Sequence, residues 1–257
     1  MKVEKYIPSP ALRPYIKAFM IVASDGGMEN RILPSTSMVM AFRLAGDITI
    51  AEQDSTAPLP SSIITGLRKT PRLVRYEKGA ATLLVIFEEG GASAWFRESL
   101  HEWFGASVDL EDIVRRDRLR DLEEQLMEAV SNRRRIALLE QFLLSTKRET
   151  PHDPLVLHAV QTIQQAKGDI RIATLMDTLP ISRDPFEKRF RKIVGTSPKH
   201  FSSLVRLRAL IDNYSTHKSL TYAGHAAGYF DQAHFIKDFK VFTGLTPHDF
   251  FKVPPHW

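Results

Sequence analysis

The segment Phe190-Arg-Lys-Ile-Val-Gly-Thr-Ser-Pro-Lys-His-Phe201 recurs later in the chain as Phe239-Lys-Val-Phe-Thr-Gly-Leu-Thr-Pro-His-Asp-Phe250. Each matching position in the second segment lies 49 residues after its counterpart in the first. A fixed offset over this many residues indicates an internal repeat, in which one structural unit occurs twice.

Each copy of the repeat is predicted to contain a helix with a defined beginning. The same offset pairs Ser182 with Asp231, and both side chains can accept hydrogen bonds from the free amides of a first helical turn. Phenylalanines then follow at i, i+4 spacing, which predicts one buried face. They are Phe186 and Phe190 in the first copy, and Phe235 and Phe239 in the second.

Each copy is also predicted to end that helix and begin another. Gly195 and Gly244 stand where a left-handed residue would terminate the helix. Ser197-Pro198 and Thr246-Pro247 then combine an N-cap with a proline at the first helical position.

A shorter apolar pattern precedes each capped helix. A helix, a tight turn and a capped second helix together form a helix-turn-helix. The residues of the pattern are Ile172, Leu175 and Leu179 in the first copy, and Ala223, Ala226, Ala227 and Tyr229 in the second.

The segment Gly228-Tyr-Phe-Asp-Gln-Ala-His-Phe-Ile-Lys-Asp-Phe-Lys-Val-Phe-Thr-Gly-Leu-Thr-Pro247 resembles the signature of the AraC/XylS family of bacterial transcription regulators. The resemblance covers roughly residues 155 to 251. It implies an all-α domain of two helix-turn-helix subdomains joined by one helix, each with its second helix in the major groove of DNA. The joining helix is also predicted independently: apolar residues recur at helical spacing from Pro198 to about Tyr214, a length of about 25 Å.

The resemblance further implies which side chains contact DNA. Those facing base edges would be Asp184, Glu187, Lys188, Gln232, Ala233, His234 and Lys237. Those contacting phosphates would be Arg183, Arg191, Ser197, Lys199, Lys240, Thr246 and His248. The carboxylates of Asp184 and Glu187 depart from a surface suited to phosphates, although a glutamate can accept a hydrogen bond from cytosine N4.

The distribution of charge agrees with DNA as the partner. Residues 151 to 257 contain 14 Lys/Arg and 9 Asp/Glu residues, a net charge of +5, whereas residues 1 to 150 contain 21 of each. Basic residues bind the DNA backbone by neutralising phosphates and releasing counterions. The whole positive excess therefore lies in the repeat region, although a net charge of this size is common in soluble proteins.

Composition argues against other chemistries. The chain has no cysteine, which excludes disulfides and thiolate metal sites, and its histidines lack the i, i+4 spacing of a metalloprotease pair. No nucleophile-elbow motif is present. We therefore expect no catalytic site, no metal and no cofactor. The lack of a signal-peptide pattern or a long apolar stretch predicts a cytoplasmic bacterial protein with no membrane partner.

The front half is predicted to form strands and then helices. Short β-branched and aromatic runs separated by Gly, Pro and Asp indicate strands before Gly90-Gly91, and helical periodicity follows. The predicted strands are 16–23, 37–44, 48–51, 63–65 and 82–87. The predicted helices are 93–100, 110–114, 119–130 and 136–144, with a linker at 149–154 and a further helix at 155–167.

The predicted fold is therefore an α+β regulatory domain, residues 1–150, with a small sheet or barrel followed by helices. An all-α DNA-binding domain of two helix-turn-helix subdomains, residues 151–257, completes the chain. The front half also resembles, more weakly, the N-terminal domain of a subset of AraC-type regulators, which senses an effector, dimerises, or does both. The residues of this resemblance are Ser9-Pro-Ala-Leu-Arg-Pro-Tyr15, Leu33-Pro34, Thr65-Gly66 and Phe87-Glu-Glu-Gly-Gly-Ala-Ser-Ala-Trp-Phe96.

Two features of the front half remain open between a functional and a structural use. The amphipathic helices of 119–144 could form a homodimer face, but packing against the domain's own sheet is the commoner use of such a stripe. Aromatic residues could line a pocket for a small-molecule effector, but aromatics at strand positions more often form ordinary core. The candidates for the pocket are Phe42, Phe87, Trp95 and Phe96.

These observations predict a sequence-specific transcription regulator that reads two successive major-groove segments and is controlled by its front domain. As an activator it would have RNA polymerase as a further partner. DNA-alkylation repair enzymes also carry such a repeat, but they need reactive and zinc-binding cysteines, which this chain lacks. The remaining alternative is a protein-interaction module in which DNA binding is weak or lost.

Overall fold

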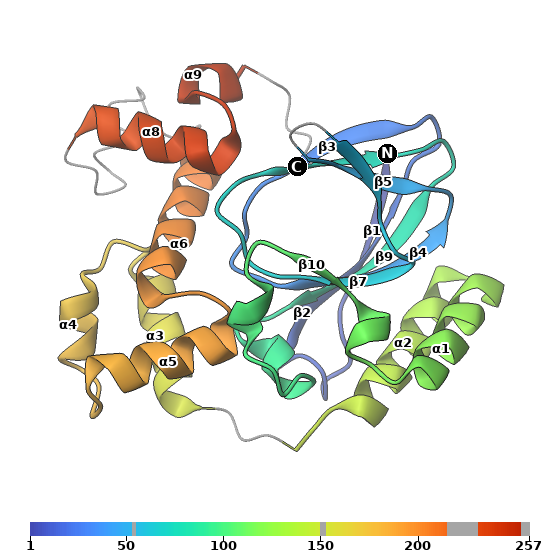
Figure 1. The fold of residues 1–257 in the computed structure, drawn as a ribbon, viewed down its shortest axis with the longest axis horizontal. Coiled ribbons are helices and arrows are strands. Elements are labelled where there is room, and N and C mark those ends of the chain that lie inside the picture. The colour runs from blue at the N-terminus through green and yellow to red at the C-terminus, as the bar shows by residue number, and fades with distance from the viewer. Residues whose placement is uncertain (53–54, 150–152, 215–230, 253–257) are drawn as a thin grey trace.

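The structure, a computed structural model, describes residues 1–52, 55–149, 153–214 and 231–252 (Figure 1). Strands make up most of the first part of the chain, and helices make up the second (Figure 1). This arrangement of an α+β front half and a helical C-terminal region confirms the predicted fold class.

A six-stranded antiparallel sheet forms one side of the front half, in the order β1-β2-β9-β4-β7-β10. The prediction identified β2, β4, β7 and β9 because their apolar runs are nearly continuous, but it missed the short and more polar β1 and β10. The strands are β1 (Lys2–Tyr6), β2 (Ile16–Ala23), β4 (Val39–Ala45), β7 (Ser62–Thr65), β9 (Ala81–Phe87) and β10 (Ser107–Asp109).

A four-stranded antiparallel sheet in the order β3-β8-β5-β6 faces the first sheet. Only β5 was predicted from the sequence. The strands are β3 (Met28–Ile32), β5 (Ile48–Glu52), β6 (Ser55–Pro58) and β8 (Arg72–Tyr76). Side chains from both sheets line a mainly apolar cavity of about 180 Å³ that is open to solvent on one side.

The alternation of side chains along β4 and β9 decides which residues face this cavity. Val39, Ala41 and Leu84 line it. Phe42 and Phe87 have the opposite parity, and they are 1% and 0% exposed in the core on the other face of the sheet. These two predicted pocket residues are therefore core residues that point away from the cavity.

Two helices, α1 (Arg116–Glu128) and α2 (Asn132–Thr146), cover that other face. Their apolar stripe is buried in the same core as the sheet residues, so it packs within its own domain. This confirms the helices predicted at 119–130 and 136–144. The buried residues of the two helices are Leu119, Leu122, Leu126, Ile136, Leu138, Leu139 and Leu143.

The α-helices predicted at 93–100 and 110–114 are wrong. Short 3₁₀ helices occur instead: η1 (Gly91–Ala94), η2 (Leu100–Trp103) and η3 (Leu110–Asp112). The first segment cannot continue as a helix because it is tied to the end of α2. The Trp95 indole donates to the carbonyl of Leu143 at 2.9 Å, and Arg148 donates to the carbonyl of Phe96 at 2.9 Å. The second segment is too short to propagate an α-helix.

The C-terminal region is helical throughout its described residues apart from its turns. Its helices are α3 (Pro154–Gln165), α4 (Ile172–Met176), α5 (Arg183–Val194), α6 (Pro198–Asn213), α8 (Gln232–Thr243) and α9 (Pro247–Phe250). The predicted joining helix corresponds to α6. The predicted first helix of the second copy, Ala223 to Tyr229, lies outside the described residues, as do residues 150–152 of the predicted linker.

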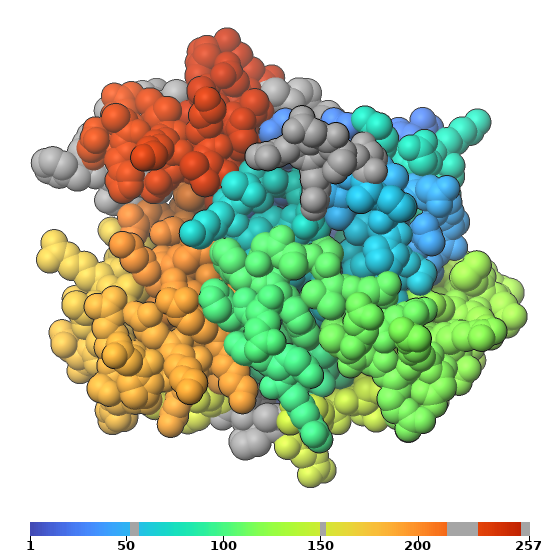
Figure 2. Space-filling model, viewed as in Figure 1, coloured from blue at the N-terminus to red at the C-terminus, as the bar shows by residue number. Residues whose placement is uncertain are grey.

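The two halves share one hydrophobic core. Leu100 and Trp103 of η2 belong to the same buried cluster as Phe186 and Phe190 of α5. Figure 2 shows atoms of the two halves meeting along one face of the molecule. The front half is thus packed directly against the first copy of the repeat. Within the described ranges, no helix combines the length and the apolar character needed to cross a bilayer.

Candidate nucleic-acid interface

The structure places the second helix of each copy, α5 and α8, where the repeat predicts it, and we call these two the reading helices. Phe186 and Phe190 form the buried face of α5, and Phe235 and Phe239 lie on the buried face of α8. Each reading helix therefore has one face fixed in a core and an opposite face open to solvent.

The predicted N-caps of the reading helices differ in their chemistry. Asp231 accepts a hydrogen bond from the amide of Ala233 at 3.0 Å, as predicted. Ser182 has the extended backbone of an N-cap residue, but its hydroxyl accepts no capping hydrogen bond. The prediction is therefore wrong for the Ser182 side chain, and the start of α5 lacks the support that Asp231 gives α8.

The helix ends and restarts follow the repeat closely. Gly195 and Gly244 end the two reading helices with left-handed φ angles of 90° and 78°. Ser197 and Thr246 then cap α6 and α9, each accepting from the amide three residues later, at 3.2 and 3.3 Å. The two copies are thus equivalent in their backbone turns as well as in their sequence.

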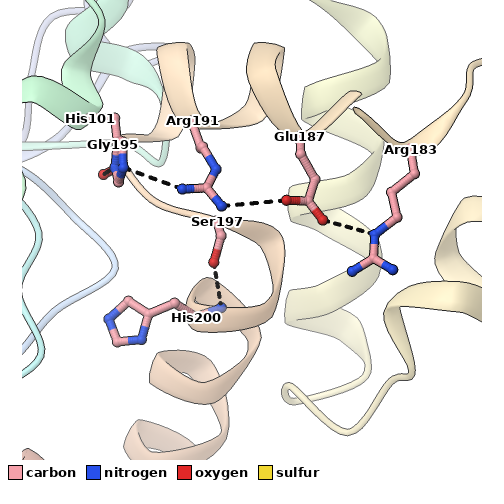
Figure 3. Close-up of polar contacts among 7 residues, drawn as sticks. All are labelled: His101, Arg183, Glu187, Arg191, Gly195, Ser197 and His200. Carbon is pink, nitrogen blue, oxygen red and sulfur yellow. Dashed lines mark hydrogen bonds and ion pairs between the residues drawn. The ribbon is translucent and has the colours of Figure 1, made fainter. Parts of the chain in front are cut away.

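Three of the predicted DNA contacts on α5 bind one another (Figure 3). Arg183 Nε lies 3.0 Å from Glu187 Oε1, and Arg191 Nη2 lies 3.5 Å from Glu187 Oε2. The hydrogen bond from Arg183 lowers the pKa of Glu187; burial opposes this effect, and the hydrogen bond from Arg191 adds to it. Both carboxylate oxygens of Glu187 are therefore occupied in the absence of DNA.

The other predicted contacts of the first copy lie at the surface. Asp184 and Lys188 are exposed on α5, and Lys199 is exposed in the first turn of α6. Ser197 is half-buried because its hydroxyl caps α6. Apart from Ser197, these side chains are accessible to a duplex.

The predicted contacts of the second copy form a more open surface. The exposed residues are Gln232, Ala233, His234, Lys237, Lys240 and His248, and Thr246 is half-buried as the cap of α9. His234 Nε2 lies 3.4 Å from Asp238 Oδ2. This second face carries two lysines on its reading helix, against one carboxylate that lies beside His234.

Sequence reasoning missed the front-half residues that contact the reading helices. His101 Nδ1 donates to the carbonyl of Gly195 at 3.1 Å, and its Nε2 lies 3.4 Å from Arg191 Nη1 (Figure 3). Arg31 Nη1 donates to the carbonyl of Thr243 at 3.3 Å. A lone histidine and a strand arginine carry no local signal, so only the folded structure reveals them. In contrast, the ion pairs of Glu187 with Arg183 and Arg191 could have been predicted, because the three residues lie at i, i+4 spacing on one helix.

The predicted effector residues are separated from the cavity between the sheets. Trp95 and Phe96 lie beyond β9, near the end of α2, and Phe42 and Phe87 lie in the core. The polar groups that line the cavity include Arg68, Arg72 and Tyr76. Burial raises the pKa of Tyr76 to about 12, so its hydroxyl stays protonated. Among the described residues, no three His, Asp or Glu side chains are grouped to hold a metal ion.

Comparison with known proteins identifies related domains. Residues 175–252 match the family model of a helix-turn-helix domain, and residues 4–109 match that of a domain of unknown function. A comparison with curated proteins finds no match. The ToxT structure from Vibrio cholerae is similar over 98% of this chain and 98% of its own, with 9% identity and a TM-score of 0.48. The xylose-binding transcription activator xylR is similar over 47% of this chain and 39% of its own, with 21% identity and a TM-score of 0.36.

Proposed function

We propose that this chain, a DNA-binding transcription regulator with an AraC-type helix-turn-helix domain, recognises two successive segments of the major groove with α5 and α8. The observation that carries the proposal is the equivalence of the two reading helices. Each buries the phenylalanine pair of the repeat at i, i+4 spacing and exposes a lysine at the same repeat position, Lys188 or Lys237. The 16 residues of α6 span about 24 Å, which is comparable with the roughly 34 Å repeat of the duplex.

The proposed contacts fall into two groups with different consequences for binding. Side chains at base edges would set the recognised sequence, whereas those at phosphates would contribute affinity and salt dependence. The proposed base contacts are Asp184, Glu187, Lys188, Gln232, Ala233, His234 and Lys237. The proposed phosphate contacts are Arg183, Arg191, Ser197, Lys199, Lys240, Thr246 and His248.

Selection of bound duplexes from random DNA by the full-length protein tests this function. We expect an enriched site with two half-sites. Lys188→Ala and Lys237→Ala should each weaken binding to that site by about 5- to 150-fold, equivalent to about 1–3 kcal/mol. The matched control is Arg116→Ala, because the Arg116 side chain is 75% exposed on α1, far from the repeat in sequence.

The two outcomes of the selection separate the alternatives. Each lysine variant should relax preference in only one half-site, and Arg116→Ala should leave both half-sites unchanged. If no sequence is enriched even at low salt, the proposal fails. The protein-interaction module with weak or lost DNA binding would then be the better description.

The front half, residues 1–150, is proposed to regulate the DNA-binding half, residues 151–257. The cavity between its two sheets supports an effector of mainly apolar character, and Arg68 and Arg72 could bind an acidic group on it. Regulation requires a difference in affinity between two states, commonly about 1–3 kcal/mol. A leucine at Ala41 would occupy part of the cavity.

Ala41→Leu tests the effector site. In cell extract the wild-type affinity for DNA should differ from that of the purified protein, and Ala41→Leu should abolish this difference. The exposed edge substitution Val3→Leu serves as control. An equal response of Ala41→Leu and wild type to the extract would exclude the cavity as the effector site.

Further partners are proposed from this role. A regulator of this kind acts on bacterial chromosomal DNA in the cytoplasm, and as an activator it would also contact RNA polymerase. We also propose that two copies of the chain can associate as a homodimer. Sedimentation of the full-length protein with and without its selected DNA would determine the number of chains bound per site.

A further inference from the structure

The front half contacts the C-terminal end of each reading helix at backbone carbonyls that differ by one position of the repeat. His101 Nδ1 donates to the carbonyl of Gly195 at 3.1 Å. Arg31 Nη1 donates to the carbonyl of Thr243 at 3.3 Å, directly before Gly244. Gly195 and Gly244 are counterparts under the 49-residue offset. Two separate residues of the front half therefore contact the C-terminal ends of the two reading helices, one at the terminating glycine and the other at the residue before it.

The chemistry of a helix end explains these contacts. The last carbonyls of a helix lack intrahelical partners and carry partial negative charge, which a side-chain N–H or a cation stabilises. The repeat itself does not supply these donors. His101 belongs to η2 and Arg31 belongs to β3 of the four-stranded sheet. The contacts are therefore interactions between halves of the molecule.

Both glycines allow the front half to approach closely. A Cβ on Gly244 would lie 2.5 Å from Arg31 Nη1 and 3.2 Å from Pro71 Cγ. A Cβ on Gly195 would lie 3.3 Å from the carbonyl oxygen of Leu100. The glycines thus have two uses, since they adopt the left-handed conformation and also leave space for the front half.

The contact with α5 is broader than the contact with α8. Beside α5, a Cβ on Gly90 would lie 3.0 Å from Ile193 Cγ2, and Phe104 meets the ring of His200, in the first turn of the adjoining α6, edge to face. At Gly244 the close neighbours are Arg31 and Pro71. Removal of one contacting side chain of the front half should therefore loosen the packing of α8 more than removal of one such side chain loosens that of α5.

We propose that Arg31 and His101, here called the capping pair, are positioning residues that fix the two reading helices relative to each other. Because both residues belong to the same packed front half, that half sets the distance and angle between α5 and α8. It thereby sets the spacing between the two DNA segments that the protein prefers. This inference rests on the proposed function, because spacing matters only if both helices read DNA.

A distance measurement tests the capping pair without DNA. The chain has no cysteine, so Lys192→Cys and Val241→Cys introduce unique sites for spin labels. These positions are counterparts under the offset, both are exposed, and neither is a proposed DNA contact. Pulsed electron paramagnetic resonance on the full-length protein then gives the distribution of distances between α5 and α8.

We expect one narrow distribution in the otherwise wild-type protein and a distribution about twofold broader in Arg31→Ala. Arg31→Lys should restore the narrow distribution, because lysine can still donate to the carbonyl of Thr243. The matched control is Arg75→Ala on the neighbouring strand β8, where Arg75 pairs with Glu29 at 3.0 Å. An equal width in Arg31→Ala and wild type would overturn the proposal.

His101→Phe tests the contact with α5, because it removes the ring donors but retains an aromatic ring beside Phe104. If this variant fails to fold, the Arg31 series decides alone. A second measurement selects DNA from a library with a variable spacer between the half-sites. Arg31→Ala should accept additional spacer lengths with unchanged base preferences, whereas a merely destabilised protein would bind all spacers more weakly. If the wild type selects no DNA, the proposed function fails, while the distance measurement still decides the capping pair.

Discussion

The ring of Phe104 meets the ring of His200 edge to face, with 5.4 Å between their centroids. This contact joins the end of η2 to the first turn of α6. Burial lowers the pKa of His200, and the nearby charge of Lys69 lowers it further, although a hydrogen bond with the Arg68 backbone opposes these effects. The folded protein therefore favours the neutral imidazole at this junction between the halves.

Acid should weaken this junction through His200. Because the pKa is lower in the folded state, the unfolded chain binds the proton more readily. The associated stability is complete above the ordinary histidine pKa and decreases as pH falls through it toward the lowered value. The free energy of unfolding between about pH 7.5 and 5 should fall more steeply in wild type than in His200→Gln. If the free energy of unfolding depends on pH in the same way in wild type and His200→Gln, His200 does not cause the loss of stability in acid.

A second prediction concerns the buried carboxylate of Glu89, whose side chain is 5% exposed. Lys17 Nζ lies 2.9 Å from Glu89 Oε1, and the hydroxyl of Thr36 donates to the same oxygen at 2.7 Å. Burial alone would raise the pKa of Glu89, but these two partners outweigh it and lower the pKa. Lys17→Met should therefore lower the free energy of unfolding at neutral pH by about 1–3 kcal/mol.

The pH dependence of that loss identifies its cause. The stabilisation from Glu89 is present above the ordinary glutamate pKa and is lost as pH falls through its lowered value. The deficit of Lys17→Met should thus shrink in acid. Lys5→Met, at an exposed position on β1, is the control and should have little effect. If the loss of unfolding free energy in Lys17→Met stays constant with pH, its cause would be the lost packing of the aliphatic part of the lysine side chain.

Local signals in the sequence were sufficient to predict the repeat. Caps and terminators act within a few residues, so Asp231, Gly195 and Gly244 could be identified without the fold. The strands β3 and β8 could not, because their charged and apolar residues are mixed and their pairing partners are distant in sequence. The helix expected at 93–100 failed for a related reason, since long-range hydrogen bonds to α2 fix that segment.

The candidate site was likewise predictable where local patterns determine it and unpredictable where long-range contacts do. The exposed positions of the reading helices follow from the helical period, once the buried phenylalanines are known. The roles of His101 and Arg31 depend on contacts across the molecule, to which no local pattern corresponds. Whether Phe42 and Phe87 point into the cavity or into the core likewise depends on which face of the sheet the helices cover.

A third prediction follows from the ion pairs of Glu187. Its carboxylate holds Arg183 and Arg191, so Glu187→Ala should release both guanidinium groups from their ion pairs and remove a negative charge from the reading face. Binding to random duplex DNA should then strengthen by up to about tenfold, with a steeper dependence on salt. Titrations at several salt concentrations would measure both effects. Weaker binding to the selected site would support the proposed contact of Glu187 with a base. Unchanged binding to random DNA would show that the ion pairs of Glu187 do not withhold the two arginines from phosphates.

The last prediction concerns Gly168, which lies between α3 and α4 with a φ angle of 75°. A Cβ at this position would lie 2.3 Å from the carbonyl oxygen of Ser202 and 2.6 Å from the amide nitrogen of Arg206. Both atoms belong to the backbone of α6, so Gly168→Ala must move the turn away from that helix. The displacement would also break the bonds that the Gly168 carbonyl accepts from Ser202 Oγ at 2.7 Å and Arg206 Nη2 at 2.9 Å.

Gly79→Ala provides a matched control for this substitution. Gly79 has a φ angle of 78°, but a Cβ there would have no neighbour within 4 Å. It should therefore cost only the backbone strain, about 1–2 kcal/mol, whereas Gly168→Ala should cost about 3–5 kcal/mol of unfolding free energy. Denaturant titration of both variants measures the difference. Because α6 joins the two copies, Gly168→Ala should also reduce DNA binding more than Gly79→Ala does. Equal losses in the two variants would mean that the close approach of Gly168 to α6 does not hold the first helix-turn-helix in place.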